Sequence, residues 1–219
     1  EQRITPHTQA IIINSPNNPS GVVYTEETLR GLAVLLERKS AEYGHPIYII
    51  ADEPYRELVY GDVTVPFIPC LYRNTIVCYS YSKSLSLPGE RIGYVYVPGF
   101  ADDSAAVYAA VSGAARVMGH VCPPTLMQKV IQLCAGERPD LAAYDENRNL
   151  LYNSLREMGY ECAKPDGAFY LFIKAPGGDA NAFSDAAKKK DLLVVPGDGF
   201  GCPGYFRICY CVSLKMIQK

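Results

Sequence analysis

Three polar groups follow short apolar stretches of the chain, and their residue types could support ligand chemistry. They are Asn18, Asp52 and the run Ser80-Tyr81-Ser82-Lys83. The stretches that precede them are residues 10–13, 47–51 and 75–79, each with the length of a buried strand. Because ligands bind outside the carboxyl ends of the strands in open α/β sheets, we expect the three groups to lie at one edge of a sheet.

Each group also has a simple structural explanation when it is taken alone. An asparagine in a proline-rich loop is commonly a turn former, and an aspartate after a strand often caps a helix. A single lysine such as Lys83 is usually a solvated surface charge. The occurrence of all three groups after successive strands favours a ligand site over three separate coincidences.

Helical patterns alternate with these strands, which is typical of βαβ units and a mainly parallel sheet. Thr25 is predicted to cap a helix, with Glu26 and Glu27 in its first turn, and Gly44 to end it. Further helices are predicted at about 101–118, 124–135 and 138–158, and a further strand at 92–97.

The pattern changes after residue 136. Strands are predicted at 168–173, 192–195 and 205–212, with a helix at 180–189 between the first two. The predicted fold class is therefore α/β: residues 1–136 form part of a mainly parallel sheet flanked by helices, and residues 137–219 form a smaller α+β C-terminal domain. A linker helix at about 137–159 opens the second domain, and a last helix begins at Ser213 where the chain stops soon after.

Composition excludes several classes of function. Charged residues make up 20% of the chain and the net charge is −2, so no nucleic-acid partner is expected. No apolar stretch is long enough to cross a membrane. The eight cysteines form no C-x-x-C pair and the three histidines lie far apart, so no metal site is expected. Cys209 and Cys211 fall in an apolar run and are predicted to belong to a buried strand. Reduced thiols and a cytoplasmic location are the expectation.

One motif is misleading. Residues 199–204 fit the pattern G-x-G-x-x-G of dinucleotide-binding loops. That loop has to follow a strand and open a helix, whereas this one contains Pro203 and leads into a predicted strand. We reject it as a nucleotide site.

Several motifs together resemble the class I/II aminotransferases of fold type I, in the manner of aspartate aminotransferase. The resemblance covers nearly the whole chain. Its motifs are Asn17-Asn18-Pro19-Ser20-Gly21, Asp52-Glu53-Pro54-Tyr55, Ser80-Tyr81-Ser82-Lys83 with Arg91, Pro165-Asp166-Gly167-Ala168-Phe169-Tyr170, residues 196–201, and Phe206-Arg207-Ile208.

The resemblance implies a role for each candidate residue. Lys83 would carry pyridoxal 5′-phosphate as a Schiff base and, once released, move a proton at the substrate. Asp52 would pair with the pyridine nitrogen, and Tyr55 and Asn18 would hydrogen-bond the ring's phenolic oxygen. The phosphate would be held by Ser80, Ser82 and Arg91, and the substrate α-carboxylate by Arg207 together with Asn18.

The implied reaction moves an amino group between an L-amino acid, with aspartate as the first candidate, and a 2-oxo acid. A homodimer is implied in the same way. The family's N-terminal phosphate loop and stacking aromatic residue are absent from these residues, and the chain opens with Glu1 rather than Met. We therefore expect a portion of a longer enzyme that is poorly active or inactive alone.

Two alternatives stay open. Another pyridoxal-phosphate enzyme on the same scaffold, a β-lyase or a decarboxylase, would share the cofactor residues. A transcription regulator that uses an aminotransferase-like domain as a ligand sensor would share the fold, and an upstream basic winged helix would mark it.

Overall fold

The chain folds into two compact units. The structure, a computed structural model, describes all residues from 1 to 219. The first unit contains residues 1–15, 24–56 and 65–139, and the second contains residues 16–23, 57–64 and 140–219. The sequence-based division after residue 136 places segments 16–23 and 57–64 in the first domain instead, and that division stays a prediction.

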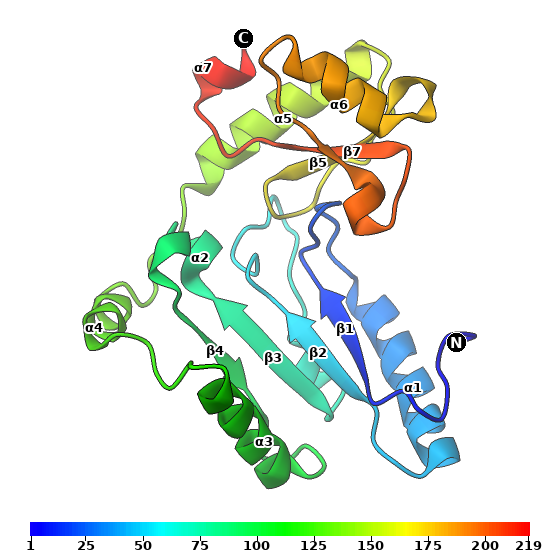
Figure 1. Ribbon diagram of the computed structural model, residues 1–219, viewed down its shortest axis with the longest axis vertical. Helices are drawn as coiled ribbons and strands as arrows, with labels where there is room; N and C mark the ends of the chain where they lie inside the picture. Colours follow the sequence, from blue (N-terminus) through cyan, green and yellow to red (C-terminus); the bar gives the residue numbers. More distant parts are fainter. The chain divides into compact units, whose positions relative to one another are not determined.

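A four-stranded sheet forms the centre of the first unit. Its strands are β1 (Ala10–Asn14), β2 (Tyr48–Asp52), β3 (Thr75–Ser80) and β4 (Gly93–Tyr96), in that spatial order. The first three strands run parallel and β4 runs antiparallel to β3 (Figure 1). The predicted mainly parallel α/β sheet is confirmed. The apolar pattern of the sequence did not predict that β4 runs antiparallel to its neighbour.

Helix α1 (Glu26–Tyr43) covers part of this sheet. The Thr25 side chain accepts a hydrogen bond from the amide of Thr28, and Gly44 ends the helix in the left-handed region, as the sequence predicts. The helix buries Leu29 and Leu36 in a core with Ile49 of β2 and other apolar residues of the sheet. Burial of that apolar stripe fixes the helix on the sheet.

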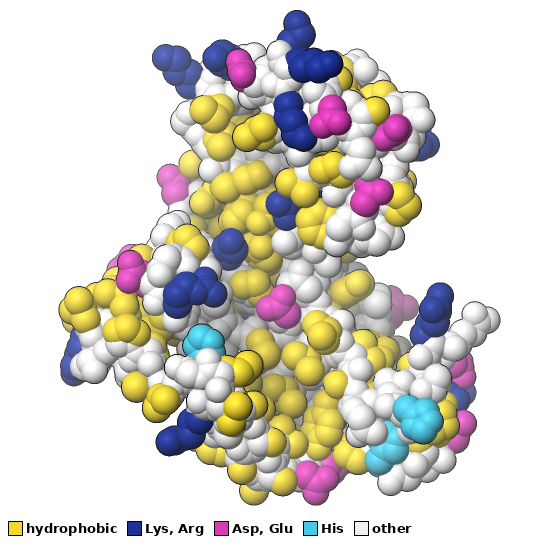
Figure 2. All heavy atoms as spheres, in the orientation of Figure 1, with side chains coloured by type: hydrophobic (Ala, Val, Ile, Leu, Met, Phe, Trp, Pro, Cys, Tyr) yellow, Lys and Arg dark blue, Asp and Glu magenta, His cyan; other side chains and the backbone are white.

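Three further helices belong to the first unit. They are α2 (Tyr81–Ser84), α3 (Ser104–Val117) and α4 (Thr125–Leu133). Helices α3 and α4 bury none of their side chains. Apolar side chains are exposed over both helices, and Figure 2 shows them gathered over α4; they include Tyr108, Val117, Leu126 and Leu133.

The second unit is an α+β layer. Its strands are β5 (Tyr170–Lys174), β6 (Val195–Pro196) and β7 (Tyr205–Cys209), with β7 between the other two and antiparallel to both. Its helices are α5 (Leu141–Glu157), α6 (Ala180–Lys188) and α7 (Leu214–Ile217). The rings of Phe183 on α6 and Phe206 on β7 stack at 4.4 Å, which joins helix to sheet.

Two strands of this unit differ from their predicted ranges. Strand β6 has only two residues, because its pairing with β7 is limited to Val195 and Pro196 and proline has no amide proton to extend the ladder. Strand β7 ends at Cys209, where its pairing with β5 ends, and Cys211 lies beyond it and is exposed. The prediction of a buried strand through Cys211 is therefore wrong. No helix in the structure is long and apolar enough to cross a membrane.

Candidate active site

Asp52 is the last residue of β2, at the carboxyl edge of the parallel strands. Asn14, the last residue of β1, lies directly beside it in the register. The side-chain amide nitrogen of Asn14 (Nδ2) donates to the backbone carbonyl of Asp52 at 3.0 Å and to the carboxylate Oδ2 atom of Asp52 at 3.0 Å. The neighbouring strand therefore fixes the orientation of this carboxylate.

The surroundings of Asp52 destabilise its negative charge. Burial raises the pKa of Asp52, and the hydrogen bond from Asn14 offsets only part of that effect. The carboxylate forms no ion pair in the chain. On its other side, burial and the charge of Asp52 raise the pKa of the Cys78 thiol. A half-buried carboxylate held only by a neutral amide is suited to a cationic ligand group, and a protonated pyridine nitrogen is such a group.

The lysine candidate lies at the next strand along. Strand β3 ends at Ser80, and α2, which carries Ser82 and Lys83, begins at the following residue, at the arrowhead of β3 in Figure 1. The Tyr79 hydroxyl and the Ser84 hydroxyl lie 2.8 Å apart and tie the short helix to the strand. The backbone therefore places the three candidates Ser80, Ser82 and Lys83 at the same sheet edge as Asp52.

Gly93 allows β4 to approach this point. A Cβ atom on Gly93 would lie 2.2 Å from the carbonyl oxygen of Tyr79 and 2.9 Å from the Cα atom of Ser80. Real side chains cannot accept such contacts with backbone, so only glycine fits beside Ser80 in this register.

The two remaining candidates of the first unit differ in burial. Tyr55 follows β2 and is 4% exposed. Arg91 is exposed, and its guanidinium donates to the carbonyl of Pro88 at 2.8 Å. Arg91 has φ 53° and ψ 52°, in the left-handed region. That conformation costs a residue with a side chain roughly 1–2 kcal/mol, and such strain is concentrated at ligand sites.

Asn18 belongs to the second unit, in a loop that is fixed by hydrogen bonds within the loop and to residues 166 and 167. Within the loop, Asn17 accepts from the amide and the hydroxyl of Ser20 at 3.1 and 2.7 Å. The carbonyl of Gly21 accepts from the amides of Asp166 and Gly167 at 2.9 and 2.8 Å. A Cβ atom on Gly21 would lie 2.3 Å from the side chain of Pro165, so the loop depends on glycine there.

The structure brings Asn18 and Arg207 into direct contact. The Nη1 group of Arg207 donates to the Oδ1 atom of Asn18 at 2.7 Å. The guanidinium carbon also lies 4.4 Å from the ring centroid of Tyr170 and 5.1 Å from that of Phe200. One amide and two aromatic faces thus fix the plane of the guanidinium.

The charge of Arg207 has no acidic partner in the chain. Its neighbours are neutral, and the planar guanidinium presents paired N–H donors that match a carboxylate. A hollow of about 420 Å³ adjoins this cluster, lined by residues 17–20, Phe172, Phe200 and Cys202. The arrangement is suited to binding an organic anion of small size.

Three residues that complete these clusters have no role predicted from the sequence. Asn14 is the partner of Asp52, and its position as the last residue of a strand was the available signal. Tyr170 and Phe200 lie in the motifs that carried the resemblance, but their stacking on Arg207 joins residues that are distant in the sequence.

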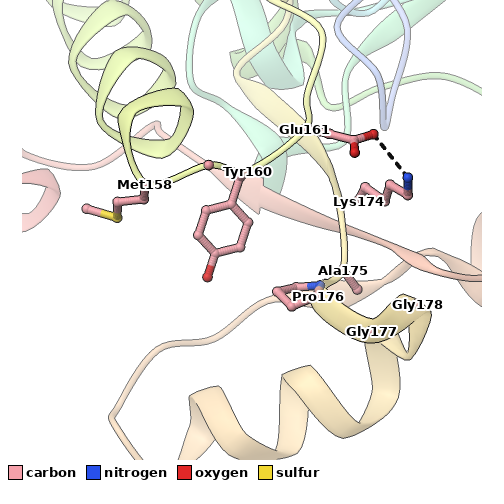
Figure 3. Close-up of a pocket in the computed structure, with 9 residues that line it drawn as sticks. Met158, Tyr160, Glu161, Lys174, Ala175, Pro176, Gly177 and Gly178 are labelled. Carbon is pink, nitrogen blue, oxygen red and sulfur yellow. Dashed lines mark hydrogen bonds and ion pairs between the residues drawn. The ribbon is translucent and has the colours of Figure 1, made fainter.

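A second hollow in the same unit has a different character. It measures about 610 Å³ and lies between the end of α5 and the turn at Pro176–Gly178 (Figure 3). Glu161 and Lys174 pair with each other at 3.1 Å, and the Tyr160 ring extends toward the turn. Because its two charged groups neutralise each other and both are exposed, this hollow offers no comparable site.

The comparisons with known proteins agree with the fold. The family described as aminotransferase class I and II matches residues 1–219. An aspartate aminotransferase of Thermotoga maritima is 33% identical over 97% of this chain and 54% of its own length. Aromatic-amino-acid aminotransferase 2 of Thermococcus litoralis is 30% identical over 100% of this chain and 57% of its own length.

Solved structures give the same result. The crystal structure of an aminotransferase from Eubacterium rectale matches with a TM-score of 0.95 and 61% identity, over 99% of this chain and 55% of that one. The chain belongs to the class I and II aminotransferases, which are pyridoxal-phosphate-dependent transferases. It spans about half the length of the curated relatives that it matches.

Proposed function

We propose that the chain provides the cofactor lysine and the substrate-carboxylate clamp of an aminotransferase that acts on an L-amino acid, with aspartate as the first candidate, and a 2-oxo acid. The observation that carries this proposal is the Arg207 cluster, a cation held by Asn18 and two rings without an acidic partner. Relatives named aspartate aminotransferase, which are 33%, 31% and 34% identical, support the choice of substrate.

Each candidate residue has a separate role in the proposed reaction. When bound, pyridoxal phosphate supplies an electron sink that lets the α-carbon of an amino acid lose a proton. The Lys83 amine binds the cofactor and transfers the proton at the substrate α-carbon, since a base in this reaction must reach that atom. The Asp52 carboxylate, oriented by Asn14, keeps a proton on the ring nitrogen. Arg207 holds the substrate α-carboxylate with two parallel hydrogen bonds.

The remaining candidates bind the cofactor's oxygen atoms. We assign Ser80 and Ser82 to its phosphate, together with Arg91, whose guanidinium matches the geometry of a phosphate group. Tyr55 and Asn18 are assigned to its phenolic oxygen. The Oδ1 atom of Asn18 also accepts a hydrogen bond from Arg207.

Product analysis tests the reaction class. The complete product of the gene is incubated with pyridoxal phosphate, a panel of amino acids and 2-oxoglutarate, and the products are identified by mass spectrometry. We expect stoichiometric glutamate and the matching 2-oxo acid, fastest with aspartate. Release of carbon dioxide, or of ammonia with pyruvate from a β-substituted substrate, would instead indicate a decarboxylase or a β-lyase. Cofactor binding without any turnover would support a sensor domain.

We further propose that the 219 residues alone turn over poorly, because they cover 54% to 57% of the length of the relatives. A homodimer and a cytoplasmic location are part of the same proposal. Size-exclusion chromatography with light scattering on the complete gene product tests the dimer.

A further inference from the structure

The end of β7 and the residues just after it bring two thiols together. The Sγ atoms of Cys209 and Cys211 lie 2.9 Å apart. Cys209 is half-buried at the end of the strand, and Cys211 is exposed just beyond it. Side chains two residues apart on an extended segment point to the same face, which explains the contact.

The separation is suited to a bond between the two sulfur atoms. A disulfide has an S–S distance of about 2.05 Å, so the sulfurs would have to approach by roughly 0.9 Å. Two residues along a strand span about 6.6 Å between Cα atoms, at the upper end of the range that disulfides bridge. A bond therefore requires the backbone between the two cysteines to contract, because the Cβ atoms of a disulfide lie about 3.5–4.5 Å apart.

We propose that Cys209 and Cys211 form a redox-active dithiol, which a low-molecular-weight disulfide converts to an intramolecular disulfide. The thiolate of the exposed Cys211 attacks one sulfur of the reagent, a mixed disulfide forms, and the first thiol leaves. The Cys209 thiolate then attacks the Cys211 sulfur, and the second thiol leaves. Two protein thiols and one reagent disulfide thus become one protein disulfide and two reagent thiols.

The dithiol lies on the strand that presents Arg207. In the register between β5 and β7, Cys209 is opposite Tyr170, whose ring holds the guanidinium, and Phe172 is opposite Arg207. Residues two apart on a strand share a face, so Cys209 and Arg207 lie on the same face of this sheet. An effect of oxidation on substrate binding would rest on the function proposed above, whereas disulfide formation itself does not.

The test uses the 219-residue chain and oxidised glutathione. Trypsin cuts after Arg207 and Lys215, and the peptide between them contains Cys209 and Cys211 and no other cysteine. After the reaction, remaining thiols are blocked with a maleimide. We expect this peptide to lose two hydrogen atoms and to carry no maleimide, and dithiothreitol to restore both labelling sites. Two labelled cysteines after oxidation would overturn the proposal.

Variants separate ring closure from simple modification of an exposed thiol. Cys122→Ser, which changes an exposed cysteine of the other unit, should leave disulfide formation unchanged. Cys209→Ser should stop the reaction at a glutathione adduct on Cys211, because the second thiol is missing. Accumulation of the same adduct in the unmodified sequence, without loss of the two hydrogens, would also overturn the proposal.

Discussion

Replacement of Arg207 by lysine tests the carboxylate clamp most sharply. Lysine keeps the positive charge but loses the planar fork, the hydrogen bond to Asn18 at 2.7 Å and the contacts with the rings of Tyr170 and Phe200. Loss of one of two charge-assisted hydrogen bonds to the substrate corresponds to about 1.5–3 kcal/mol. We therefore expect kcat/KM of the complete gene product to fall about 10- to 100-fold.

Two controls make this result specific. Arg156→Lys changes an exposed arginine on α5 whose guanidinium contacts only the carbonyl of Tyr160 among the described hydrogen bonds, and kcat/KM should stay within about twofold. A simple amine without a carboxylate should react equally slowly with the unmodified protein and with Arg207→Lys. If Arg207→Lys leaves kcat/KM for the best amino acid within about threefold, Arg207 does not bind the substrate carboxylate.

Three further predictions follow from the same structure. Phe200→Leu removes one ring from Arg207 and should raise KM about 2- to 5-fold with little change in kcat, because a cation–π contact of this kind is worth about 0.5–1 kcal/mol. Steady-state kinetics should show Phe200→Tyr near the original value. Gly93→Ala should lower the free energy of unfolding by about 1–3 kcal/mol in urea titrations. Gly113 has open space around it, so Gly113→Ala should be neutral or stabilising. Equal effects of the two substitutions would contradict the close approach at Ser80. Burial raises the pKa of Asp52, so the folded chain keeps the proton on this carboxyl to a higher pH than the unfolded chain. The free energy of unfolding should therefore fall as the pH rises above about 4 through the folded pKa. Urea titrations at a series of pH values should show that this decline is absent from Asp52→Asn, and parallel curves for the two proteins would contradict the prediction.

Local sequence signals predict much of this structure because their causes are local. The cap at Thr25, the left-handed glycine at position 44 and the strands that end at Asp52 and Ser80 follow from capping and from apolar patterns. The carboxyl-edge rule then places Asp52 beside the segment that carries Lys83.

Features that depend on partners distant in the sequence were not predictable in the same way. The end of β7 at Cys209 is set by where β5 begins, at Tyr170, and the apolar run through Cys211 carries no sign of that limit. The role of Asn14 depends on strand pairing over 38 residues. The rings around Arg207 come from β5 and from the segment before β7, and only the folded second unit brings them together.

The most direct test of the account is to locate the cofactor on the chain. The complete gene product is saturated with pyridoxal phosphate, reduced with borohydride and digested with trypsin. Reduction should fix the label on Lys83 and block cleavage there, so the label should appear on the uncut peptide from residue 74 to residue 91. Lys83→Ala should abolish labelling, while Lys129→Ala, on α4, should keep it. A label on another lysine, or labelling that survives Lys83→Ala, would contradict the central claim.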